Sequence, residues 1–151
     1  MADRTFPTAT SRSRSVSEVA PHVHAGNPAR EAFWILRIGF IAAPILAGLD
    51  KFLDLMVDWD KYLAPWVNGL LGGHGHAFML AAGVIEIVAG IGIALRPRIF
   101  GYVVAAWLLG IIVNLLSIPG YFDVALRDLG LALGALALAR LGKEFDRPKS
   151  A

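Results

Sequence analysis

Six polar residues in apolar surroundings carry the groups of this chain best suited to do chemistry. They are Asp50, Lys51, Glu86, Asn114, Arg127 and Asp128. An ionisable side chain at the centre of a membrane span raises the free energy of insertion by about 2.5–3.5 kcal/mol, so each such residue is expected to have a binding partner or a functional role. These side chains match no known catalytic set, and no catalytic residue is assigned. We treat them as candidate ligand-binding residues.

Four of the six residues, all of them charged, are expected at one depth. Asp50 and Lys51 end the first apolar stretch, and Arg127 and Asp128 precede the last one. Two acids and two bases can cancel one another, which predicts an interhelical ion-pair cluster that fixes the order of the helices. The alternative is an outward-facing pocket in which Lys51 and Arg127 donate hydrogen bonds to a small anionic or quinone-like headgroup.

Glu86 lies near the middle of its apolar stretch, with about 13 Å of hydrocarbon on each side at 1.5 Å per residue. A lone carboxylate at this depth is expected to be protonated. The exceptions would be a cation such as Arg37 reaching it or a hydrogen bond from a residue such as Asn114. Two roles stay open for Glu86: a buried carboxyl that helps helices pack, and a proton-relay or ligand-binding group.

The elements that position these residues follow from the composition. Of 151 residues, 56% are hydrophobic and only 17% are charged, which excludes an ordinary soluble domain. Since a bilayer core needs about 20 apolar residues per helix, we expect an all-α membrane protein, a four-transmembrane-helix bundle. The predicted spans are about 33–53, 77–95, 99–118 and 122–141, with an external interfacial loop at 54–76.

The cations outside these spans or at their ends predict the orientation. Ten of them fall on one face of the bundle, in the N-terminal tail, the turn at 96–98 and the C-terminal end, whereas Lys61 stands alone on the other. By the positive-inside rule both termini are cytoplasmic. Residues 1–30 are polar and are predicted to form a disordered cytoplasmic tail. Residues 143–151 are predicted to form a C-terminal cytoplasmic tail.

Small residues share a helix face with each polar one, which predicts close packing with the polar groups turned inward. The four stripes are Arg37, Pro44, Gly48 and Lys51; Gly83, Glu86 and Gly90; Ala106, Gly110 and Asn114; and Arg127, Gly130 and Gly134.

The sequence contains few residues that could form a metal site or carry out thiol chemistry. The chain has no cysteine, and its two histidine pairs, His22/His24 and His74/His76, are predicted to lie on opposite sides of the membrane. No histidine falls within a predicted span, so a haem held by two histidines in the bundle is also excluded. No cofactor bound covalently or through metal ligands is expected, so a redox role would need either a cofactor of a partner protein or a bound quinone. No basic stripe with interleaved aromatic residues points to nucleic acid.

Several motifs resemble the DoxX-like family of bacterial four-helix integral membrane proteins over residues 33–142. They are Leu-Arg-Ile-Gly (36–39), Ala-Gly-Leu-Asp-Lys-Phe (47–52), Gly-Val-Ile-Glu-Ile-Val-Ala-Gly (83–90), the Arg-rich turn (96–98) and Asp-Val-Ala-Leu-Arg-Asp-Leu-Gly (123–130). The last motif and the long external loop suggest a distinct subgroup. The resemblance implies the four-helix fold, residence in the bacterial inner membrane and association with membrane oxidoreductases, including a thiosulfate:quinone oxidoreductase.

The expected function is an accessory or anchoring subunit of a membrane redox system, without catalytic activity of its own. The first alternative is a quinone-interacting oxidoreductase subunit, and the second is a small transporter. The expected partners are the lipid bilayer, a membrane redox protein and further copies of this chain in a homo-oligomer.

Overall fold

The computed structural model describes residues 27–146, and this stretch is helical without any β-strand. The elements in chain order are α1 (Pro28–Leu53), the 3₁₀ helix η1 (Trp59–Tyr62), α2 (Pro65–Leu70), α3 (Gly75–Leu95), α4 (Pro97–Leu116) and α5 (Phe122–Phe145). Three of these helices, α1, α3 and α4, are long and apolar enough to cross a membrane. The protein is therefore membrane-embedded.

Local sequence signals explain the helix ends. Asn27 caps α1, since its side chain accepts hydrogen bonds from the backbone N–H groups of Ala29 and Arg30. Asp54 ends α1 in the left-handed conformation, at φ 47°. Pro97 occupies the first turn of α4, where its missing N–H is not needed.

The helices overrun some predicted boundaries. α1 begins at Pro28, before the predicted start of the first span at 33. Residues 28–30 are therefore helical, and their assignment to the N-terminal tail is wrong. The rest of the predicted N-terminal tail, residues 1–26, lies outside the described residues, as do 147–151. α5 continues to Phe145, beyond the predicted end at 141.

α5 is 24 residues long and is the most charged of the long helices. Its charged residues are Asp123, Arg127, Asp128, Arg140, Lys143 and Glu144. They gather near the two ends and leave 129–139 uncharged. Because of these charges, α5 does not qualify as a membrane span by composition, whereas α1, α3 and α4 do.

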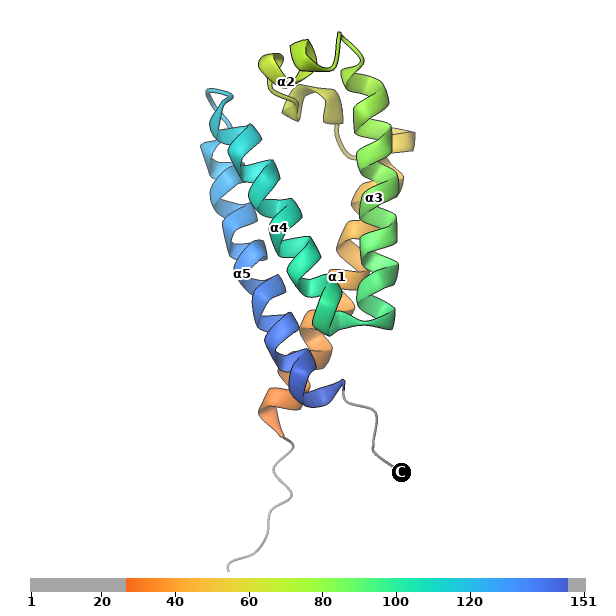
Figure 1. The fold of residues 1–151 in the computed structure, drawn as a ribbon, viewed down its shortest axis with the longest axis vertical. Coiled ribbons are helices and arrows are strands. Elements are labelled where there is room, and N and C mark those ends of the chain that lie inside the picture. The colour runs from red at the N-terminus through yellow and green to blue at the C-terminus, as the bar shows by residue number, and fades with distance from the viewer. Residues whose placement is uncertain (1–26, 147–151) are drawn as a thin grey trace, which may run out of the picture.

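The four long helices form two antiparallel pairs, α1 with α3 and α4 with α5 (Figure 1). The pairs converge at the end that holds the start of α1 and the end of α5, where the rings of Phe33 and Phe145 lie 5.7 Å apart. Toward the other end the pairs diverge, and the segment with η1 and α2 lies there (Figure 1). Both ends of the described chain are thus at one end of the bundle.

Glycines allow close contact within the α1–α3 pair, as the sequence predicts. A Cβ at Gly48 would lie 2.5 Å from the carbonyl oxygen of Gly83, and one at Gly90 would lie 2.9 Å from that of Ile41. The predicted stripe on α4 is wrong, because Ala106 and Gly110 are exposed. α4 instead packs through Gly101, where a Cβ would lie 2.8 Å from the carbonyl oxygen of Ala135.

On α5, only part of the predicted stripe faces the bundle. A Cβ at Gly134 would lie 3.2 Å from the Phe40 ring of α1, whereas Gly130 has open space around it. The buried side of α5 is lined mainly by alanines, at positions 125, 132, 135 and 139. These small side chains allow α4 and α5 to approach closely.

Candidate functional site

A buried ion pair joins α1 to α3. Lys51 Nζ lies 2.7 Å from Glu86 Oε2, and the two side chains are 4% and 12% exposed. The contact follows from the glycine packing, because the Lys51 Cβ lies only 3.2 Å from the Cβ position of Gly83, about one turn before Glu86. The cation that reaches Glu86 is therefore Lys51, and the sequence-based suggestion of Arg37 is wrong.

Trp59 covers this pair and links it to Asp50. Lys51 Nζ lies 3.6 Å from the centroid of the Trp59 ring, within cation–π range. The indole N–H of Trp59 donates to Asp50 Oδ2 at 2.7 Å. Asp50 Oδ1 accepts from the backbone N–H groups of Leu55 and Met56, at 3.0 and 2.9 Å. Both oxygens of this buried carboxylate are thus bonded to the segment that follows α1.

Asn114 holds the same loop from the side of α4. Its Oδ1 accepts from the backbone N–H of Ala64 at 2.9 Å, and its Nδ2 donates to the carbonyl oxygen of Tyr62 at 2.6 Å. The ring of Tyr62 also meets that of Tyr121, with centroids 5.1 Å apart. Asn114 is therefore a loop anchor, and the predicted hydrogen bond from it to Glu86 is wrong.

Arg127 and Asp128 do not join Asp50 and Lys51. Arg127 Nε lies 3.4 Å from Oδ1 of neighbouring Asp128, and the Arg127 side chain is 69% exposed while that of Asp128 is 9% exposed. Since Lys51 pairs with Glu86 and Asp50 bonds to the loop, the predicted four-charge cluster does not form among the described residues. The predicted pocket with Lys51 and Arg127 as joint donors is also not formed.

Arg37 ties α1 to α3 at the opposite end of the bundle. Its Nη2 donates to the carbonyl oxygen of Ala94 at 2.5 Å, and its Nη1 lies 4.0 Å from Oδ1 of Asp146, the residue that follows α5. Its guanidinium also lies 5.0 Å from the centroid of the Trp34 ring. These contacts give Arg37 a structural role at this end of the bundle.

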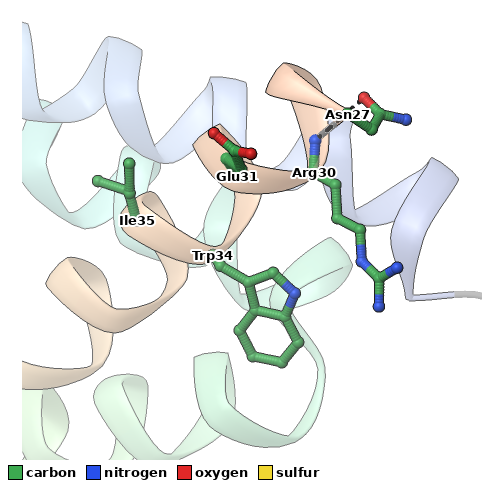
Figure 2. Close-up of a pocket in the computed structure, with 5 residues that line it drawn as sticks. All are labelled: Asn27, Arg30, Glu31, Trp34 and Ile35. Carbon is green, nitrogen blue, oxygen red and sulfur yellow. Dashed lines mark hydrogen bonds between the residues drawn. The ribbon is translucent and has the colours of Figure 1, made fainter. Parts of the chain in front are cut away.

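Two surface hollows in the described part of the chain lie away from the ion pair. One lies at the start of α1, where Arg30 and Trp34 project to one side of the helix and Glu31 and Ile35 to the other (Figure 2). Another lies in the loop beside His76, whose Nδ1 is 2.9 Å from Asp60 Oδ2 in an exposed contact. Within residues 27–146 no three His, Asp or Glu side chains gather as metal ligands would.

Two tryptophans have buried surroundings or contacts that the sequence does not predict. Trp59 belongs to the loop at 54–76 that is predicted to lie at the membrane interface, but in the structure it lies over Lys51 and donates a hydrogen bond to Asp50. The indole N–H of Trp107 on α4 is buried without a hydrogen-bond partner among the described residues. One signal in the sequence could have identified Trp59: it follows two adjacent charged residues, Asp50 and Lys51, by only a few positions. A loop that folds back on α1 after Leu53 can bring its ring to them.

Together these contacts form one network at the divergent end of the bundle. Asp50 and Trp59 fasten the loop to α1, Asn114 fastens it to α4, and Lys51–Glu86 joins α1 to α3. The network can fix the positions of α1, α3, α4 and the loop relative to one another. Comparison of the chain with protein-family models, with curated proteins and with solved structures found no match.

Proposed function

We propose that this protein is an accessory subunit that anchors a redox partner in the bacterial inner membrane and has no catalytic activity of its own. The redox part of the proposal rests on the motifs at 47–52, 83–90 and 123–130, which resemble those of the DoxX-like family. The accessory part rests on the contacts of the candidate residues within this chain.

The proposed topology has four spans with both ends of the chain in the cytoplasm. It adds α5 to the three apolar helices, because α5 is antiparallel to α4 and runs the length of the bundle (Figure 1). The charges of α5 then lie near the two membrane surfaces, and the excess of Lys and Arg at the end that holds both ends of the described chain faces the cytoplasm.

One observation carries the accessory function: four of the candidate ligand-binding residues are engaged inside the protein. Lys51 and Glu86 bind each other, Asp50 binds the loop, and Asn114 binds the loop from α4. A ligand would have to break these bonds before binding there, at a cost of about 1–3 kcal/mol for each buried group left unsatisfied. Such residues are better suited to hold a scaffold than to exchange a ligand.

The second candidate function, a quinone-binding subunit, is favoured by Trp107. Its buried indole N–H has no partner in the described part of the chain, and a quinone carbonyl oxygen is an acceptor for such a donor. In this function Glu86 would be the proton relay, taking up a proton that a quinol releases when it is oxidised to the quinone. This function requires Lys51 to release Glu86 when the quinone binds.

Copurification tests the proposed function. The tagged chain, extracted from its native membrane into lipid nanodiscs, should carry a flavoprotein or cytochrome subunit in fixed stoichiometry. Isolation of the chain with stoichiometric quinone and no protein partner would contradict the accessory function and support the second candidate. Isolation of the chain alone, with ion flux after reconstitution in liposomes, would support a transporter instead.

A further inference from the structure

We propose that Arg98, Tyr102, Arg140 and Lys143 form a binding site for the headgroup of an anionic phospholipid. The site lies on the α4–α5 seam, at the end of the bundle where α5 finishes. It is separate from the network around Lys51 and does not depend on the proposed redox role.

Close packing of α4 on α5 brings the four residues together. A Cβ at Gly142 would lie 3.0 Å from the backbone nitrogen of Arg98, so the start of α4 rests directly on the last turns of α5. One turn further along α4, the hydroxyl of Tyr102 lies beside the side chains of Arg140 and Lys143. Lys143 Nζ is 5.6 Å from the centroid of the Tyr102 ring.

The three cations are exposed and are not neutralised by ion pairs among the described residues. Of the two acids near the end of α5, Asp146 lies against Arg37, and Glu144 is exposed. Arg96, next to the start of α4, adds a further exposed cation. The site therefore has an excess of positive charge and a tyrosine hydroxyl, which suit a phosphate group.

Apolar stripes run from this site along both helices. On α4 the exposed residues after Tyr102 are Ala106, Leu109 and Val113, at a spacing of three or four. On α5 the residues before Arg140 on the same spacing are Leu136, Leu133 and Leu129, each at least 36% exposed. Acyl chains can lie along these stripes while the headgroup meets the cations.

This arrangement favours a lipid over a soluble phosphate compound. A soluble anion would use only the cations, whereas a phospholipid also covers the stripes of α4 and α5. Cationic groups near the membrane surface attract anionic lipids by about 1 kcal/mol each. The combination of cations, tyrosine and adjoining apolar stripes thus specifies an anionic lipid.

Native mass spectrometry of the full chain in detergent micelles tests this site. With phosphatidylglycerol and phosphatidylcholine added in equal amounts, the wild-type chain should retain phosphatidylglycerol. The double variant Arg140→Gln/Lys143→Gln should bind it about 30-fold more weakly, with phosphatidylcholine binding unchanged. Lys61→Gln, which removes an exposed cation at the other end of the bundle, should bind like the wild type.

Several results would overturn the site. Equal phosphatidylglycerol binding by the double variant and the wild type would do so, as would an equal loss in Lys61→Gln. Displacement of the lipid by the same concentration of soluble glycerol phosphate would show that the stripes contribute nothing. Circular dichroism reports whether the double variant is folded; if it is not, the single variant Lys143→Gln must show a selective loss of phosphatidylglycerol for the site to stand.

Discussion

Lys51 and Glu86 bind each other across the α1–α3 interface, with 2.7 Å between Nζ and Oε2. The Trp59 ring lies over the ammonium group, and the side chains of Lys51 and Glu86 are only 4% and 12% exposed. Because the pair is buried, each charge depends on the other for its stabilisation. The stability of the α1–α3 pair therefore depends on the two residues jointly.

Lys51→Met should destabilise the protein strongly. It leaves the carboxylate of Glu86 buried without its cation, which costs about 3–5 kcal/mol in other buried pairs. The thermal unfolding midpoint in detergent should fall accordingly. Lys61→Met removes an exposed lysine and should leave the midpoint almost unchanged. Equal midpoints for the two variants would show that the ion pair does not stabilise the fold.

The sequence predicts the small-residue faces of α1 and α3, but neither the pairing of these two helices nor the partner of Glu86. Gly48, Gly83 and Gly90 fall on recognisable small-residue stripes, and they form the close contact. Lys51 is expected to stay at the outer end of α1, yet its long side chain extends toward Glu86. Lys51 lies beside Gly83, and one helical turn rises only about 5.4 Å, so its long side chain can reach Glu86 about one turn further along α3.

Asn114 shows a second limit of sequence analysis. Its stripe with Ala106 and Gly110 predicts an inward face, but Asn114 lies near the end of α4 and bonds to the loop. The path of the loop after α1 decides this contact. That path depends on Asp50, Trp59 and the turns between them, which no periodic pattern encodes.

Gly48→Ala should destabilise the α1–α3 pair. The added Cβ would lie 2.5 Å from the carbonyl oxygen of Gly83, and forced contacts of this kind cost about 1–3 kcal/mol. Gly110→Ala is the matched control, because no atom lies within 4 Å of its added Cβ. It should be neutral or stabilise the helix by up to about 1 kcal/mol. Thermal unfolding of both variants checks the packing, and a less stable Gly110→Ala would contradict it.

Asn114→Leu should release the loop while leaving the helices intact. It removes the acceptor of the Ala64 N–H, a group on a fully buried residue, and the donor to Tyr62. At about 1–3 kcal/mol for the lost bonds, hydrogen exchange at Ala64 should become about tenfold faster or more. Ser117→Ala removes only a local bond to the Val113 carbonyl and should not change the exchange rate. Unchanged exchange in Asn114→Leu would show that other contacts hold the loop.

Cysteine labelling tests the proposed topology. The chain has no cysteine of its own, so each introduced thiol is unique. Lys61→Cys in the loop should react with an impermeant thiol reagent in intact cells, whereas Glu144→Cys at the end of α5 should react only after the membrane is opened. Both positions are exposed in the folded chain. Labelling of Glu144→Cys in intact cells would contradict a cytoplasmic C-terminal end.

The double variant Lys51→Met/Glu86→Gln tests most directly whether the buried pair is part of a scaffold. It removes both charges together, so neither is stranded in the α1–α3 interface. The measurement is the partner protein and quinone recovered with this variant from native membranes, beside its unfolding midpoint. The scaffold account predicts a midpoint restored well above that of Lys51→Met and wild-type recovery of the partner. A folded double variant that loses a quinone or a partner present in the wild type would contradict it.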